Sequence, residues 1–443
     1  MERIMTEFID NHFDEIKADL AELIAIPSES DDKEKVKEAL RLALKQAEAL
    51  GFRAYSVLDE QVGIVEMGEG PETLGILAHV DVVPAGDPAQ WDSDPYKAEE
   101  RNGRIYGRGT LDDKGLVVSS LYAMKAVQEL GRPLHKKVQL IIGTQEEVEW
   151  TDMDEYVKQY PLPDYGFTPD GSYPICNIEK GYIDQIMEFD LTEEEPEGLY
   201  LKELEIGTAV NVVPGEAKAV LSDGSEIHVT GKACHSSQPE MGVNSIYLLG
   251  EELKKKGLSE NKLLKLLYAI CEDFEGHYGD KLGLRSESDW YQGEFVHRNV
   301  LSPTILNAKD GKAEMAVNVR FPYGEDRYRV IDRLTLWAEE HGGKTVSVDS
   351  QHAVFVPKTS PFLKVFADAY EEVSGLKNEF VLEYGGTYAK AMPNIVSWGP
   401  LFPGDEDMCH QANEYIGSDA LQISTKIFAE AIAGIVLSEE SFK

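Results

Sequence analysis

The sequence contains few cysteines and no long apolar run. Its four cysteines are scattered over 443 residues, and no two of them form a Cys-x-x-Cys pair. This scatter excludes a disulfide framework and a thiolate zinc site, so we expect reduced cysteines and a cytoplasmic location. No apolar run reaches the length of about 18 residues that spans a bilayer. The acidic N-terminus also lacks the basic start and apolar stretch of a signal peptide, so we expect no membrane partner.

Positive charge is scarce as well. Lysine and arginine number 43 against 80 aspartate and glutamate residues, which gives a formal net charge of −37. Such a surface repels polyphosphates, so nucleic acid is excluded as a partner, whereas cationic ligands and metal ions are attracted. A hydrophobic content of 42% at this length allows a sizeable core.

The hydrophobic pattern divides the chain into three parts. Residues 1–181 alternate helix-like and strand-like stretches, beginning with residues 1–24 as one helix, and this predicts an α/β domain with a mostly parallel sheet. Residues 182–350 combine half-exposed strand patterns with amphipathic helices, which is typical of an α+β domain. The first pattern returns in residues 351–443. We therefore predict one α/β domain that is interrupted by an inserted α+β domain.

Acidic and imidazole side chains lie just past the ends of predicted strands or in the loops that follow them. His79 closes the apolar run "LGILA", and Asp81 faces the same side because strand residues two apart share a face. The other such residues are Asp112 in "GRGTLDDKG", Glu146 and Glu147 after "VQLIIGT", Asp170 in "FTPDGSYPI" and His410 in "GDEDMCHQANEY". Ligands of open α/β sheets bind beyond the carboxyl ends of the strands, so these residues are candidates for one site.

Charge balance favours a site for two metal ions. The carboxylates of Asp112, Glu147 and Asp170, together with a bridging hydroxide, would neutralise two divalent cations, with His79 and His410 as neutral donors. Without metals the clustered carboxylates would repel one another. This mixture of nitrogen and oxygen donors suits zinc, and also manganese or cobalt.

Six stretches, taken together, resemble those of a known family. They are "GILAHVDVVP", "RIYGRGTLDDKG", "GTQEEVEW", "FTPDGSYP", "GKACHSSQPEMGVNS" and "CHQANEY". They are similar to the dinuclear zinc peptidases of the carboxypeptidase G, aminoacylase and succinyl-diaminopimelate desuccinylase family. The likeness is greatest to its bacterial dipeptidase branch, which includes peptidase V and Xaa-His dipeptidases, and "EYGGTYAKAMPNIVSWGP" resembles a late loop of that branch.

The resemblance implies which residues hold the metals. His79 and Asp170 would hold one zinc ion, and Glu147 and His410 would hold the other. Asp112 would bridge the two ions. The family also carries a cis peptide bond after its bridging aspartate.

Two further carboxylates receive roles from the resemblance. Asp81 would accept a hydrogen bond from the far nitrogen of His79 and orient the ring. Glu146 would be the general base, which takes a proton from the metal-bridging water and passes it to the leaving amine. Adjacent strand residues face opposite sides, so a turn at residues 144–145 is needed before Glu146 and Glu147 can serve one site.

The inserted domain would act as a lid. His235 matches the lid histidine of the family, which would donate a hydrogen bond to the oxyanion. Asn211 and Arg320 match polar lid positions, and Arg320 either holds a substrate carboxylate with two hydrogen bonds or is a solvated strand residue. A late loop either lets its backbone approach the substrate or is a plain tight turn. Its candidate residues are Gly385, Gly386 and Thr387.

Three functions remain open from the sequence. The favoured one is a dipeptidase for unblocked dipeptides, and the alternative is an N-acyl-amino-acid deacylase that uses the same metals. The insert of about 170 residues is longer than the lid of the dimeric deacylases, so the resemblance implies a monomeric dipeptidase. The third function, a metal- or peptide-binding protein without turnover, is disfavoured because Glu146 is present.

Overall fold

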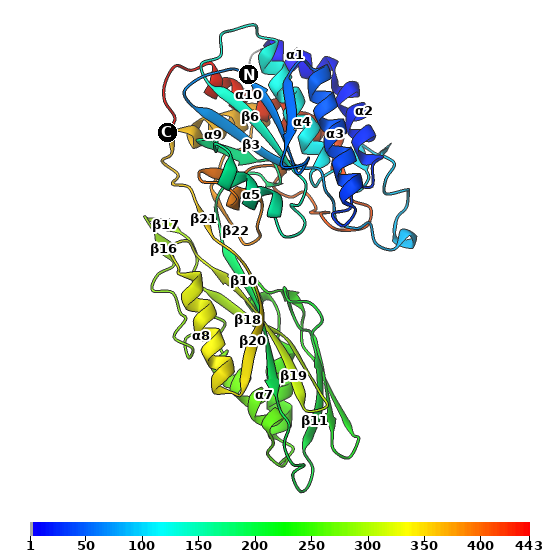
Figure 1. Cartoon of the computed structure of the whole chain (residues 1–443), viewed down its shortest axis with the longest axis vertical. Coiled ribbons are helices and arrows are strands. Elements are labelled where there is room, and N and C mark those ends of the chain that lie inside the picture. The colour runs from blue at the N-terminus through cyan, green and yellow to red at the C-terminus, as the bar shows by residue number, and fades with distance from the viewer. Residues whose placement is uncertain (1–2) are drawn as a thin grey trace. The chain divides into compact units, whose positions relative to one another are not determined.

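The computed structural model describes residues 3–443, which form two compact units (Figure 1). The first unit runs to Asn177 and resumes with Phe355–Val381 and Thr387–Lys443. The second unit consists of Ile178–Val354 and Leu382–Gly386. These limits lie a few residues from the predicted limits at 181 and 350. The short segment joins the second unit because its carbonyls accept hydrogen bonds from that unit's N–H groups, among them the Lys180 amide.

A nine-stranded sheet forms the centre of the first unit. Its order is β1 (Arg53–Val57), β2 (Val62–Met67), β6 (Lys137–Gly143), β3 (Thr73–His79), β7 (Tyr165–Thr168), β23 (Ile395–Ser397), β9 (Cys176–Glu179) and β21 (Val354–Phe355), with β22 (Val381–Glu383) beside β9. The four strands from β6 to β23 run parallel, whereas β1, β2 and β9 pair antiparallel. The parallel strands β3 and β6 are buried along almost their whole length, as their continuous apolar runs predict.

Helices cover both faces of this sheet. They are α1 (Arg3–Asn11), α2 (Phe13–Ile24), α3 (Lys33–Ala49), α4 (Lys114–Gln128), α5 (Thr151–Gln159), α9 (Pro361–Ser374) and α10 (Ser418–Val436). On β2, a Cβ at Gly63 would touch Leu40 of α3, whereas Val62 and Ile64 pack in the cluster that contains α5. Successive strand residues face opposite sides, so α3 and α5 lie on opposite faces.

The single helix predicted for residues 1–24 is wrong in one respect. The chain breaks at His12 into α1 and α2, because His12 leaves helical geometry and its ring Nδ1 lies 2.8 Å from the carbonyl oxygen of Phe8. A histidine within a helical pattern carries no sequence signal for such a break.

The second unit is an antiparallel sheet with helices on one face. Its order is β14 (Glu226–Thr230), β13 (Glu216–Leu221), β11 (Leu201–Ile206), β18 (Val300–Lys309), β19 (Lys312–Phe321), β10 (Gly181–Asp190) and β20 (Gly343–Gln351). Alternate residues of β10 are buried, and they share one apolar core with α6 (Ser245–Lys254), α7 (Lys262–Asp273) and α8 (Arg327–Glu340). The predicted fold class, an α/β domain interrupted by an α+β domain, is confirmed.

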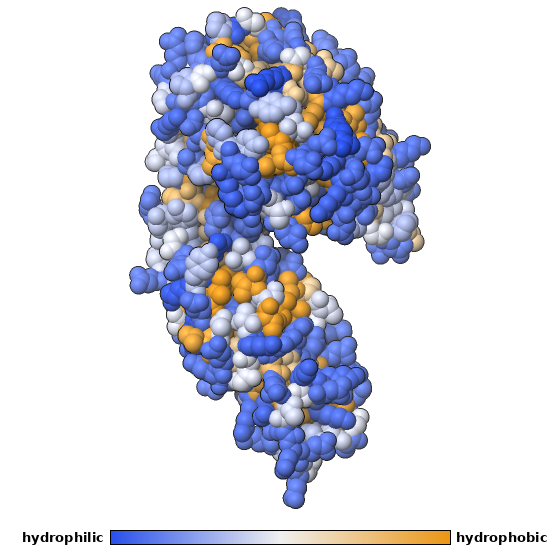
Figure 2. Space-filling view, in the orientation of Figure 1, coloured by the Kyte–Doolittle hydropathy of each residue, from blue (hydrophilic) through white to orange (hydrophobic). Residues whose placement is uncertain are grey.

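Short elements complete the two units. In the first they are β4 (Glu99–Arg101), β5 (Arg104–Tyr106) and β25 (Tyr415–Gly417), β8 (Gly171–Ser172) with β24 (Pro400–Leu401), and the 3-10 helices η1 (Pro88–Gln90) and η3 (Tyr388–Lys390). In the second they are β12 (Val212–Val213) with β15 (Cys234–His235), β16 (Trp290–Tyr291) with β17 (Glu294–Phe295), and η2 (Pro239–Met241). No helix within residues 3–443 combines the length and apolarity needed to cross a membrane. The face in Figure 2 is mainly hydrophilic, with smaller apolar patches.

Candidate metal centre

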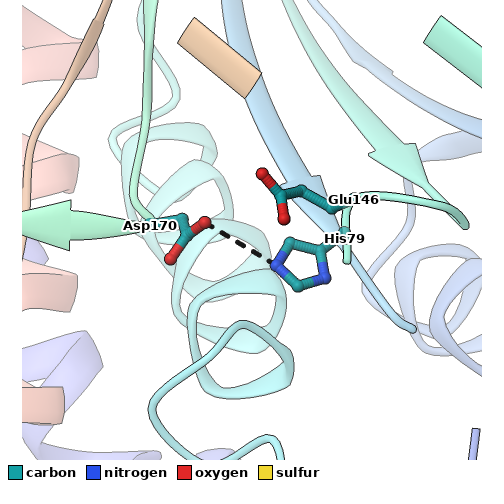
Figure 3. Close-up of side chains that lie close together, drawn as sticks. All are labelled: His79, Glu146 and Asp170. Carbon is teal, nitrogen blue, oxygen red and sulfur yellow. Dashed lines mark ion pairs between the residues drawn. The ribbon is translucent and has the colours of Figure 1, made fainter. Parts of the chain in front are cut away.

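One group of possible metal ligands gathers at the carboxyl ends of three adjacent strands. His79 is the last residue of β3, Glu146 follows β6, and Asp170 follows β7. One ligand atom from each lies within 4.8 Å of the others. Figure 3 shows the three side chains converging, with the ion pair between His79 Nε2 and Asp170 Oδ2, which are 3.7 Å apart, drawn as a dashed line.

A second group consists of Asp112, Glu147 and His410. Their ligand atoms also lie within 4.8 Å of one another. The Nε2 atom of His410 is 2.9 Å from Glu147 Oε2 and 3.1 Å from Asp112 Oδ2. His410 comes from the loop before β25, so the part of the first unit that follows the insert completes this group.

Asp112 faces both groups. Its Oδ1 lies 3.0 Å from His79 Nε2, and its Oδ2 lies 3.1 Å from His410 Nε2. The side chain is buried, with 7% of the residue exposed. The peptide bond between Asp112 and Asp113 is cis, as the resemblance implies. One carboxylate that presents an oxygen to each of two histidines has the arrangement that a bridging ligand requires.

The fit to metal ions can be judged from buried polar atoms. Among the described residues, His79 Nε2, Asp112 Oδ1 and Glu146 Oε1 are buried and have no hydrogen-bond partner. Buried polar atoms are almost always paired, so three such atoms in one cluster indicate a missing ligand. Imidazole nitrogens and carboxylate oxygens are donors for zinc, manganese and cobalt. The residues therefore fit a pair of divalent cations.

The pKa values of the cluster point the same way. Burial, followed by repulsion from Asp112, raises the pKa of Glu147 to about 7. Burial also opposes ionisation of Asp112, but its contacts with His410 and His79 hold its pKa below the ordinary value. Hydrogen bonds to Asp112 and Glu147 raise the pKa of His410 to about 11. A protonated His410 thus offsets part of the carboxylate charge here, and divalent cations would supply positive charge while leaving the ring neutral.

A turn brings both glutamates to the site. Strand β6 ends at Gly143 and the chain bends at Thr144, but the turn itself spans residues 146–149, slightly later than the predicted residues 144–145. The backbone N–H groups of Glu146 and Glu147 donate to the two carboxylate oxygens of Asp81, at 3.1 and 3.2 Å. Because both oxygens of the buried Asp81 are occupied in this way, the turn is held at the end of β3.

The ring of His79 is oriented by Asp81, but not through the predicted atoms. Its Nδ1 lies 3.0 Å from the backbone carbonyl oxygen of Asp81, and the carboxylate is farther away at 3.4 Å. The carboxylate is engaged by the turn, so the ring bonds the carbonyl instead. A carbonyl oxygen only accepts, so the proton is on Nδ1 and the lone pair of Nε2 faces the cluster.

His235 lies in the second unit on β15. Its Nδ1 accepts hydrogen bonds from the Ser237 backbone N–H at 3.2 Å and from the Ser237 hydroxyl at 2.6 Å. Burial, together with the positive charge of Arg320, lowers the pKa of His235. The ring is therefore neutral near pH 7, with its proton on Nε2, and can act as a hydrogen-bond donor.

Arg320 is a buried residue rather than a solvated one. Only 7% of it is exposed, its Nη1 donates to the Tyr384 carbonyl at 2.9 Å, and its Nε donates to Asn318 Oδ1 at 3.3 Å. Asn211 is exposed, and its backbone carbonyl accepts the N–H of Ser236. These residues belong to the same unit as His235.

The late loop divides between the two units. Gly385 and Gly386 belong to the second unit, and the Gly385 N–H donates to Glu383 Oε1 at 3.1 Å. Thr387 belongs to the first unit, where its hydroxyl accepts the Ala389 N–H at the start of η3. The loop therefore forms an ordered turn, and no contact within it assigns a substrate role.

Two buried acids near the cluster were not predicted. Asp152 accepts the N–H groups of Thr144 and Gln145, and Glu414 accepts those of the Asp112 loop. Glu414 stands in the quoted stretch "CHQANEY", four residues after His410, and that was its only sequence signal.

Most of the chain matches one known protein family. Residues 75–434 match the sequence profile of peptidase family M20/M25/M40. The chain belongs to the M20 peptidase family. It is therefore an enzyme that hydrolyses peptide bonds, and the predicted family resemblance is confirmed.

Relatives cover nearly the whole M20 chain. "Putative dipeptidase YtjP" of Bacillus subtilis (strain 168) is 34% identical over an alignment 431 residues long with its gaps, which covers 90% of this chain and 90% of that protein. A "Putative dipeptidase" of Staphylococcus epidermidis (strain ATCC 12228 / FDA PCI 1200) is 32% identical over an alignment 463 residues long with its gaps, which covers 95% of this chain and 97% of that protein.

Solved structures show the same M20 fold. The aminoacylhistidine dipeptidase of Vibrio alginolyticus has a TM-score of 0.66 at 16% identity and covers 94% of this chain and 95% of its own. Human carnosine dipeptidase 1 has a TM-score of 0.63 at 18% identity and covers 97% of this chain and 98% of its own. At these identities the likeness concerns the fold alone.

Proposed function

We propose that this M20 peptidase is a metal-dependent dipeptidase for unblocked dipeptides, with Glu146 as its general base. The observation that carries the proposal is the position of Asp112, whose two oxygens face His79 and His410. A carboxylate shared in this way allows two cations to be held side by side. The proposed ligands are His79, Asp170, Glu147, His410 and the shared Asp112.

The metal pair has one role in the proposal. When bound, two divalent cations polarise the scissile carbonyl and lower the pKa of an attacking water. Zinc is the proposed metal, and manganese and cobalt suit the same donors.

Glu146 is the proposed proton carrier. Burial and neighbouring carboxylates raise its pKa well above the ordinary range, and one of its oxygens lacks a hydrogen-bond partner. A carboxylate in that environment readily accepts the proton of the attacking water and can return it to the leaving amine. Its N–H is fixed by Asp81, and its carbonyl accepts a hydrogen bond from the indole of Trp150.

The second unit contributes the proposed substrate contacts. His235 is neutral with its donor on Nε2, which is the form needed to stabilise an oxyanion. The proposal assigns the substrate carboxylate to Arg320, with Asn211 and the backbone of Gly385, Gly386 and Thr387 as further contacts. A guanidinium that still has unshared N–H groups can bind a carboxylate with two hydrogen bonds.

The dipeptide as substrate is supported by the relatives. Two relatives at 34% and 32% identity carry the name dipeptidase. We also propose that the enzyme is a monomer in the cytoplasm, where its four free cysteines stay reduced. Gel filtration tests the monomer.

The decisive experiment is a metal-reconstitution series. Chelator-treated protein is supplied with zinc, manganese or cobalt and assayed on dipeptides with a free amino end, and in parallel on N-acetyl and N-succinyl amino acids. The proposal expects turnover of the dipeptides. Turnover of the N-acyl substrates alone would identify a deacylase, and dipeptide binding without hydrolysis under every metal would identify a binding protein.

A further inference from the structure

Glu414 binds the loop that carries Asp112. Its carboxylate is fully buried and accepts the backbone N–H groups of Gly109, Leu111 and Asp112, at distances between 2.9 and 3.2 Å. All three N–H groups belong to the turn between β5 and α4. The side chain of Glu414 thus holds, through the backbone, the one carboxylate that faces both groups of ligands.

Arg108 extends this link to a third loop. Its Nη1 donates to Glu414 Oε2 at 2.6 Å, and its Nη2 donates to the carbonyl of Pro84 at 3.3 Å. Pro84 lies in the loop that follows His79 on β3. Only 1% of Arg108 is exposed, so the ion pair is shielded from water.

The backbone of Glu414 reinforces the arrangement. Its carbonyl accepts the N–H of Gly107, and the next residue begins β25, which pairs with β5. His410 stands four residues earlier in the same loop. Glu414 thus connects the two residues: its side chain holds the loop of Asp112, and its own loop carries His410. These contacts fix the separation between Asp112 and His410.

Glu414 does not itself compete for a metal ion. Its two oxygens accept three N–H groups and the Arg108 guanidinium, and these contacts use the lone pairs that a ligand would need. Its role must therefore be exerted through the residues that it holds.

We propose that Glu414 is a positioning residue that fixes the bridging Asp112 against His410 and so sets the affinity of the cation held by Asp112, Glu147 and His410. This inference rests on the proposed pair of cation sites. A ligand held in place binds a metal more tightly than one that must be ordered on binding, and outer partners of this kind change metal affinity by about 10- to 100-fold.

The test measures cation affinity in the full chain. Wild-type and Glu414→Gln proteins are stripped with a chelator and titrated with zinc in competition with a chromophoric chelator. Glutamine has a similar shape, but it turns one acceptor oxygen into a donor and leaves Arg108 without its counter-charge. We expect two binding events in both proteins, with the affinity of one of them reduced about 10- to 100-fold in the variant. Excess zinc should then restore most of kcat.

Glu72→Gln is the matched control. Glu72 is also buried, and its Oε2 accepts the Tyr165 hydroxyl and the Phe442 N–H, but it lies before β3, at the end opposite His79. This variant should lose stability without losing zinc affinity. Equal zinc affinity in Glu414→Gln and wild type would overturn the inference, as would an equal loss of affinity in Glu72→Gln.

Two further readouts keep the test conclusive. If Glu414→Gln does not fold, Arg108→Lys replaces it, because it keeps the positive charge but loses the two-armed link between Glu414 and Pro84. We expect a smaller loss of zinc affinity in the same direction, and an unchanged affinity would overturn the inference. A wild-type protein that binds fewer than two zinc ions would instead contradict the proposed function.

Discussion

Asp81 and Asp152 together accept the backbone N–H groups of four consecutive residues. Asp152 Oδ2 takes those of Thr144 and Gln145, and Asp81 takes those of Glu146 and Glu147. Both acids are fully buried. The turn that carries the proposed base and a proposed ligand is thus held by two carboxylates, one from the loop after β3 and one from α5.

Replacing Asp81 by asparagine should loosen this turn. Asparagine offers one acceptor oxygen in place of two, so one of the two glutamate N–H groups loses its partner. We expect kcat to fall about 10- to 100-fold with a smaller change in KM. Steady-state kinetics on a dipeptide measure both constants.

Asp164→Asn is the control for that variant. Asp164 accepts the Thr73 N–H at the opposite end of β3, so it has the same chemistry away from the site. An equal loss of kcat in both variants would show that Asp81 acts only through general stability.

Glu146→Gln should remove proton transfer and keep the metals. The amide cannot accept the proton of the attacking water, so we expect kcat to fall about 10²- to 10⁴-fold. Metal analysis should still find two cations per chain. The exposed Glu149 in the same turn provides the control variant Glu149→Gln.

The Glu146 variant also separates two roles. An oxygen of Glu146 lies within 4.8 Å of a ligand atom of His79 and of one of Asp170, so the three side chains could bind one ion together. Loss of a cation in Glu146→Gln would make it a ligand, and near-normal turnover would remove it from the mechanism.

His410→Ala should lose one cation together with activity. The ring approaches Asp112 and Glu147 with the same nitrogen, so its removal leaves that cation with carboxylates alone. Metal analysis after gel filtration gives the stoichiometry, with His135→Ala as a variant at a partly exposed histidine of the same unit. Full metal content in His410→Ala would refute the second cation site.

His235→Ala should reduce kcat without changing metal content. All five proposed ligands belong to the first unit, whereas His235 belongs to the second. Loss of one donor to the oxyanion costs about 10²- to 10³-fold in kcat. The control is His228→Ala, because His228 is an exposed histidine of the same unit whose ring contacts Glu226. Unchanged turnover in His235→Ala would exclude the proposed role.

Lys180 should make stability depend on pH. Burial, followed by repulsion from Arg320, lowers its pKa from 10.5 to about 7. Between these values the unfolded chain binds more protons than the folded chain, so the free energy of unfolding rises with pH, by at most about 1.4 kcal/mol per pH unit. Below pH 7 both states are protonated and this dependence ends.

Urea unfolding at pH 7, 8 and 9 tests this prediction. The unfolding free energy of the wild type minus that of Lys180→Met should increase with pH, because only the wild type carries the lysine. The exposed Lys256 gives the control, and Lys256→Met should show a constant difference. A constant difference for Lys180→Met would contradict the assigned ionisation.

Continuous apolar strands made much of the fold predictable. The runs of β3 and β6 identified buried parallel strands, and the change of pattern near residue 182 identified the insert. The direction of β1 and β2 was not predictable, because a short apolar strand has the same pattern in parallel and antiparallel pairs. Their antiparallel pairing makes the sheet mixed.

Side chains that reach the site directly were easier to predict than those that act through the backbone. His79 closes an apolar strand, and His410 lies in the stretch "CHQANEY"; both features belong to the sequence itself. Asp152 and Glu414 accept backbone N–H groups. Because every residue except proline offers such a group, no sequence spacing reveals which residues an acidic side chain will bind. For Glu414 the partner Arg108 is also 306 residues away in the chain.

The interrupted first unit has a consequence for biosynthesis. Four of the five proposed ligands precede the insert, and the last, His410, follows it. A ribosome must therefore translate the whole second unit before His410 and Glu414 exist. A growing chain that stops within the insert lacks His410, so the proposed second cation pocket can form only after the insert has been translated.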